Sequence, residues 1–221
     1  MKKNFNILNL CLILAVLIGD VFYIVYDTIL IKSITSAGFV ALAAINLYYA
    51  IKLKTPHKKF CITMLVGLFF AMMGDIILEI HFISGAALFA VGHVFYFVAY
   101  TFLVKFKWED LIYAIVILVV VVPFILFVPI FDFGGVFMQL VCIAYAVVIS
   151  CMVSKSISNF VQNKSRLNLI VMIGSILFMF SDLMLLLNVF ASLPVVGILC
   201  LATYYPAECM LAYSILEASE K

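Results

Sequence analysis

The feature that most constrains this chain is a series of eight long apolar segments separated by short polar connections. The segments cover residues 5–25, 33–51, 60–80, 84–104, 110–131, 134–154, 167–189 and 194–216. A helix that crosses a bilayer needs roughly 20 predominantly apolar residues, and the strands of a membrane barrel alternate instead. The sequence therefore predicts an all-α polytopic membrane helix bundle with eight transmembrane helices, forming a single domain over residues 1–221.

The composition excludes the main soluble classes. Hydrophobic residues make up 68% of the chain and charged residues 11%, whereas a soluble domain is about 45–50% apolar and about 25% charged. Soluble enzymes, disordered linkers and disulfide-rich secreted domains are therefore excluded, and we expect neither a nucleic-acid partner nor an obligate protein partner. The cysteines stand singly in apolar stretches, so we expect reduced thiols; they are Cys11, Cys61, Cys142, Cys151, Cys200 and Cys209.

The basic residues predict the orientation, because cytoplasmic connections are enriched in Lys and Arg. With eight spans, Lys32 is the one basic residue on the outer side. The others share the opposite side: Lys2, Lys3, Lys52, Lys54, Lys58, Lys59, Lys105, Lys107, Lys155, Lys164, Arg166 and Lys221. We therefore expect both termini in the cytoplasm and a multi-pass protein of the cell membrane, which is the inner or cytoplasmic membrane if the source is bacterial.

Five ionisable residues fall well inside the apolar segments: Asp20, Asp75, His93, Asp182 and Glu208. Each costs a few kcal/mol to insert, so each is a candidate functional residue. At 1.5 Å per residue, the three aspartates lie roughly 22–24 Å from the cytoplasmic starts of their helices, at similar height. Asp75 and Asp182 are the strongest candidates, whereas Asp20 lies near a helix end.

Structural roles remain open for these groups. Asp75 and Asp182 could instead make interhelical hydrogen bonds or pair with Lys32, and His93 could simply bridge two helices. Glu79 and His81 are expected to be outer-loop residues, and most of the other acids are expected to be solvated. Two aspartates and a histidine are a weak signal for a metal site, so we expect no metal and no cofactor.

Several short motifs occur in order between about residues 30 and 215. They are Gly74-Asp75-Ile76-Ile77-Leu78, Phe82-Ile83-Ser84-Gly85, Phe89, His93-Val94-Phe95-Tyr96, Ser181-Asp182 with Leu185 and Asn188, and Tyr204-Tyr205-x-Ala207. This series resembles the signature of the YhhN family, the lysoplasmalogenases, and Lys32 resembles the lysine that opens the family's second helix. Ser33 stands where the family usually has proline, and Glu208 stands where it often has glutamine.

The resemblance implies a hydrolase that cleaves the vinyl ether bond of lysoplasmalogen, with a lysophospholipid as substrate and membrane lipid around it. The products would be a fatty aldehyde and glycerophosphoethanolamine or glycerophosphocholine. Two close buried carboxyls do not both ionise readily, so one can serve as acid while the other stays an anion. We expect Asp75 and Asp182 to form this catalytic pair, with either residue as the acid and the other as the anion. The expected substrate-binding or orienting residues are Lys32, His93, Tyr96, Asn188, Tyr204, Tyr205 and Glu208, with Lys32 near the lipid phosphate.

A different class of protein uses similar residues. A small proton-coupled transporter or lipid translocator also places titratable Asp and His side chains at mid-depth in the membrane. The small-residue–Asp pairs Gly19-Asp20, Gly74-Asp75 and Ser181-Asp182 hint at repetition but show no regular period. A structural or sensor protein is a third reading, in which the buried acids would have no use.

Overall fold

The structure, a computed structural model, describes residues 2–219 of the chain. Its α-helices are α1 (Lys2–Tyr26), α2 (Ile29–Lys52), α3 (Lys58–Leu78), α4 (Phe82–Thr101), α5 (Leu111–Phe127), α6 (Val136–Gln162), α7 (Arg166–Phe190) and α8 (Pro194–Glu217). A 3-10 turn, η1 (Trp108–Asp110), precedes α5. Within the described residues eight helices are long and apolar enough to span a membrane and there is no β-strand, which confirms the predicted all-α polytopic bundle.

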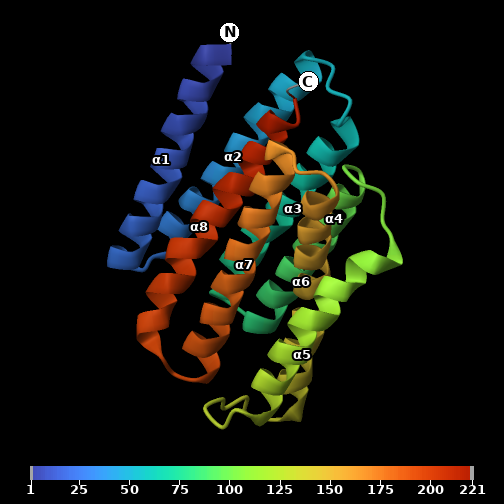
Figure 1. The fold of residues 1–221 in the computed structure, drawn as a ribbon. Helices are drawn as coiled ribbons and strands as arrows, with labels where there is room; N and C mark the ends of the chain where they lie inside the picture. The colour runs from blue at the N-terminus through green and yellow to red at the C-terminus, as the bar shows by residue number, and fades with distance from the viewer. Residues whose placement is uncertain (1, 220–221) are drawn as a thin grey trace.

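Six of the helices form a closed ring in the order α2, α3, α4, α6, α7 and α8, and α8 returns to α2. Helix α8 also contacts α3 across the ring. Helix α1 packs outside against α2 and α8, and α5 packs outside against α6 (Figure 1). The two outer helices therefore leave much of their surface to the surrounding lipid.

The start of α1 and the end of α8 lie at the same end of the bundle (Figure 1), as an even number of spans requires. The connections at residues 27–28, 79–81 and 191–193 lie at the other end, which we call the turn end. Which end faces the cytoplasm stays a prediction, and Lys221 lies outside the described residues.

The short connections at the turn end fix where two charged residues fall. The Thr28 hydroxyl accepts a hydrogen bond from the backbone N–H of Ile31 and caps α2, so Lys32 stands in the first turn of that helix. His81 caps α4 by accepting from the backbone N–H of Ser84. Glu79 stands two residues earlier, at the C-cap of α3. Side-chain caps satisfy N–H groups that a helix start leaves unpaired.

The interior is apolar, with a minority of polar groups. Phe39, Leu42, Met64, Phe178 and Leu211 are fully buried and come from α2, α3, α7 and α8. The six cysteines are all unpaired, as expected, but Cys11 is exposed and not buried in the apolar interior.

The predicted end of the sixth segment, at residue 154, was wrong. Helix α6 continues to Gln162, and Lys155 is completely buried instead of lying in a polar connection. Its Nζ lies 2.6 Å from the carboxylate of Asp110, which stands at the predicted start of the fifth segment. Asp110 also accepts a hydrogen bond from Ser158 at 2.5 Å. A buried lysine is tolerated where a carboxylate pairs with it, and Asp110 supplies that partner from η1.

Candidate functional site

A cavity of about 270 Å³ lies near the turn end of the bundle, and we call it the polar cavity. It is lined by Tyr23, Ile24, Asp27, Lys32, Asp75, Leu78, Glu79, Phe89, Ser181, Asp182, Leu185, Asn188, Pro194, Gly197, Ile198, Cys200, Leu201 and Tyr204. Asp27 is exposed and Glu79 partly exposed, so the cavity reaches the surface at the turn end. The cavity contains both aspartates that the sequence singled out.

Asp75 stands on α3, one turn before that helix ends, and is 4% exposed. One carboxylate oxygen accepts hydrogen bonds from Ser36 at 2.5 Å and from Tyr205 at 3.0 Å. The other lies 3.1 Å from the Nζ of Lys32. With an ammonium group and two hydroxyl donors around it, the Asp75 carboxylate is held in place from three directions and has a counter-ion.

Lys32 also pairs with Glu79, whose carboxylate lies 2.5 Å from the Lys32 Nζ and accepts a hydrogen bond from Tyr23 at 2.8 Å. Burial alone would raise the pKa of Glu79, but the hydrogen bond and charge of Lys32 and the hydrogen bond from Tyr23 outweigh it and lower the pKa below its usual value. Glu79 lies in the connection between α3 and α4, as expected, but it also lines the polar cavity, which was not expected. The lysine expected at the outer boundary is itself buried between two carboxylates.

Asp182 has a different environment. It stands on α7, and its carboxylate accepts a hydrogen bond from Tyr145 of α6 at 2.6 Å. The same oxygen lies 3.3 Å from Nε2 of His93, which is itself 2.8 Å from the Tyr145 hydroxyl. These three side chains form a triangle at the contact of α4, α6 and α7. No lysine or arginine touches Asp182 in the described part of the chain.

The remaining predicted residues fall into two groups. Asn188 and Tyr204 line the polar cavity. Tyr96 and Glu208 do not line it but bind each other, because the Tyr96 hydroxyl donates to the Glu208 carboxylate at 2.8 Å in the buried core. Asp20 is buried on α1 outside the cavity lining, and one of its carboxylate oxygens has no hydrogen-bond partner.

Sequence reasoning missed Ser36 and Tyr145 and dismissed Glu79. A weak signal existed for two of them, since Ser36 follows Lys32 by four residues and Glu79 follows Asp75 by four. Residues four apart lie on one face of a helix, so each can share the surroundings of its partner. Tyr145 has no such ionisable neighbour on α6, and only the packing of α6 against α4 and α7 brings it to Asp182.

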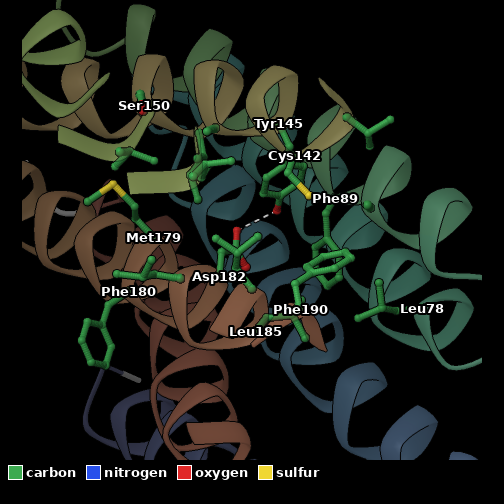
Figure 2. A pocket seen from close by; sticks show the side chains of 18 of the residues that line it. Leu78, Phe89, Cys142, Tyr145, Ser150, Met179, Phe180, Asp182, Leu185 and Phe190 are labelled. Carbon is green, nitrogen blue, oxygen red and sulfur yellow. Dashed lines mark hydrogen bonds between the residues drawn. The ribbon is translucent and has the colours of Figure 1, made fainter. Parts of the chain in front are cut away.

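A second cavity of about 230 Å³ adjoins the first, and we call it the apolar cavity. Figure 2 shows it from close by, with the hydrogen bond between Tyr145 and Asp182 drawn as a dashed line. It is lined by Leu78, Phe82, Ala86, Phe89, Val121, Ile125, Val141, Cys142, Tyr145, Ala146, Ile149, Ser150, Ile176, Met179, Phe180, Asp182, Leu183, Leu185, Leu186 and Phe190. Asp182 therefore lines both cavities.

Eight helices that are long and apolar enough to span a membrane, with a polar and an apolar cavity among them, define a polytopic membrane protein with a candidate site at Asp75 and Asp182. Residues 28–215 match the sequence profile of the YhhN family, and the chain belongs to that family. No curated protein and no solved structure matches the chain. Among residues 2–219, no three His, Cys, Asp or Glu side chains are grouped as ligands of one metal ion.

Proposed function

We propose that this protein hydrolyses the vinyl ether bond of lysoplasmalogen and releases a fatty aldehyde and glycerophosphoethanolamine or glycerophosphocholine. Membership of the YhhN family supports a hydrolase of this type. The observation that carries the proposal is that two carboxylates with unlike partners line one cavity. Asp75 is paired with a lysine, whereas Asp182 is held by a tyrosine and a histidine.

The chemistry requires an acid, an anion and water. The acid gives its proton to the β-carbon of the vinyl ether, so an O–H bond breaks, a C–H bond forms, and the ether carbon becomes an oxocarbenium ion. The anion stabilises this positive charge. Water then adds to the oxocarbenium carbon and loses a proton to the carboxylate that served as acid. The resulting hemiacetal breaks its bond to the glycerol oxygen, which takes up the hemiacetal proton, and the aldehyde leaves.

The side chains around the cavity fit these needs. Asp75, with Lys32 beside it and hydroxyl donors from Ser36 and Tyr205, is suited to remain a carboxylate. Lys32 lines the cavity and is suited to meet the phosphate of the lipid head group, with Glu79 as the counter-ion that the phosphate would displace. Asn188 of α7 adds an amide to the lining of the same cavity.

The test is release of aldehyde from lysoplasmalogen by the purified protein in detergent micelles. We expect Asp75→Asn and Asp182→Asn each to lower kcat by about 10² or more, the usual contribution of a positioned acid or charge. Asp132→Asn is the matched control, because Asp132 is an exposed acid in the connection between α5 and α6. Near-full rates in both cavity variants, with normal folding, would remove the proposed pair. Absence of aldehyde from the wild-type protein would remove the proposed reaction.

A further inference from the structure

Asp182 is the polar member of the small set of residues that line both cavities. The shared residues are Leu78, Phe89, Asp182 and Leu185. The carboxylate therefore stands at the boundary between two chambers. One contains Lys32, Glu79 and Asn188, and the other, shown in Figure 2, is lined almost entirely by hydrocarbon. A ligand that contacts Asp182 from both sides must be polar at one end and apolar at the other.

The apolar cavity borders the lipid-facing surface of the bundle. Helices α5 and α7 both contribute to its wall, yet α5 packs against α6, and no Cα atom of α5 lies within 8 Å of a Cα atom of α7. Ile176 and Phe180 of α7 line the cavity and are 39% and 41% exposed, so the cavity is open to the surroundings of the bundle along α7. An apolar chain can therefore reach the cavity sideways from the membrane, between α5 and α7.

We propose that the apolar cavity binds the hydrocarbon chain of a single-chain lipid whose head group lies in the polar cavity, so that the bond joining chain and head group lies beside Asp182. The inference rests on the proposed function for the identity of that bond. A volume of about 230 Å³ is below the roughly 300–1,000 Å³ of sites for drug-sized ligands. The cavity thus accommodates the first part of one chain, and the remainder continues between α5 and α7 into the lipid.

This placement assigns the two carboxylates. The β-carbon that receives the proton belongs to the hydrocarbon chain, on the far side of the ether oxygen from the head group. Asp182 borders the chain cavity, whereas Asp75 lines only the polar cavity and is paired with Lys32. Asp182 is therefore the proton donor and Asp75 the stabilising anion. His93 contacts Asp182 and lines neither cavity, so it is a positioning residue. Tyr145 lines the apolar cavity and acts through Asp182, which its hydroxyl holds in place.

The first test needs no turnover. A saturated alkyl lysophosphatidylethanolamine that carries a diazirine in its chain has no vinyl ether to hydrolyse and labels whatever its chain touches. We expect labelling of the wild-type protein at cavity residues such as Cys142, Ile149 and Met179. Labelling confined to the outer surfaces of α1 and α2, with none in the apolar cavity, would overturn the inference.

Two adjacent alanines of α4 give a matched pair of variants. Ala86 lines the apolar cavity, and Ala87 is exposed on the same helix. Ala86→Phe fills the cavity, so we expect about a tenfold loss of cavity labelling and of kcat/KM for a long alkenyl chain, which corresponds to about 1.4 kcal/mol. For Ala87→Phe, cavity labelling and kcat/KM should stay within about twofold of the wild-type values. If Ala86→Phe does not fold, Met179→Trp fills the same cavity from α7.

The outcomes separate the two proposals. Labelling in the apolar cavity that Ala86→Phe removes, without aldehyde release from lysoplasmalogen, would support the chain site and reject the proposed reaction. Aldehyde release that Ala86→Phe and Ala87→Phe affect equally would support the reaction and reject the chain site. A preserved rate on very short alkenyl chains in Ala86→Phe, together with the loss on long chains, would support both.

Discussion

Replacing Lys32 by methionine tests the charge arrangement at the polar cavity. Lys32 is 4% exposed and is the shared cation of two carboxylates. Methionine has a similar length and suits an apolar helix, so the change removes the charge without leaving a large void. It leaves Asp75 buried without a counter-ion, which we expect to destabilise the folded protein.

The two ion pairs contribute unequally. Removing one partner of a buried pair costs about 3–5 kcal/mol, and the Lys32–Asp75 pair, with both side chains 5% exposed, is of this kind. Asp75 keeps hydrogen bonds from Ser36 and Tyr205, which places the loss near the lower end, at about 3 kcal/mol. The Glu79 side chain is 36% exposed, so solvent screening limits its pair to about 1 kcal/mol or less.

The assay is unfolding in mild-detergent micelles by titration with sodium dodecyl sulfate, followed by circular dichroism. We expect Lys32→Met to lose about 3 kcal/mol, and the double variant Lys32→Met with Asp75→Asn to be about 2 kcal/mol more stable than the sum of the single variants predicts. Lys52→Met, at the exposed end of the same helix, should unfold like wild type. Equal stability of Lys32→Met and wild type would refute the buried pair.

Three further predictions follow from other contacts. Tyr145→Phe removes the hydroxyl that holds Asp182. In aldehyde-release kinetics, kcat should fall about tenfold while KM stays unchanged. A change in KM alone would contradict a positioning role for Tyr145. Lys155→Met should lower the free energy of unfolding by about 3–5 kcal/mol, with much of it regained in the double variant with Asp110→Asn, measured by the same titration. The pKa of Glu79 is lowered in the folded state, so the stability that its carboxylate contributes is complete above the usual pKa of 4.5 and is lost as the pH falls below that value. Glu79→Gln should therefore lose less thermal stability on acidification than the wild-type protein does. Equal losses in the two proteins would contradict this.

The number and type of the helices could be predicted because membrane helices are recognised by length and hydropathy alone. The end of α6 could not. Residues 154–162 are mostly polar and resemble a connection, yet Ser154, Lys155 and Ser158 all contact Asp110 in a distant part of the chain. Asp110 is more than forty positions away in the chain, so local composition does not reveal that its backbone oxygen and carboxylate bind these residues.

The candidate site was predicted to the extent that its residues carry unusual charge. Asp75 and Asp182 stood out because an acid inside an apolar segment is rare and costly. Ser36 and Tyr145 did not, because serine and tyrosine are ordinary in membrane helices and gain meaning only from the carboxylates they touch. The pairing of Tyr96 with Glu208, apart from either cavity, likewise depends on how α4 faces α8 and not on any local pattern.

The packing beneath the polar cavity bears on the choice between an enzyme and a transporter. A transporter must open a route from its site to either side of the membrane, whereas a lipid hydrolase needs access from one side and from the lipid. Phe39, Tyr96, Phe178 and Tyr205 are each fully buried in the core next to the cavity residues, and Phe178 contacts the rings of Phe89 and Tyr204, which line it. A route through this layer would require several large side chains to move together, whereas the proposed path of the hydrocarbon chain between α5 and α7 does not cross it. The two functions separate in detergent, where no gradient exists: an enzyme still releases aldehyde, and a proton-coupled transporter shows activity only as substrate-stimulated proton flux in sealed proteoliposomes.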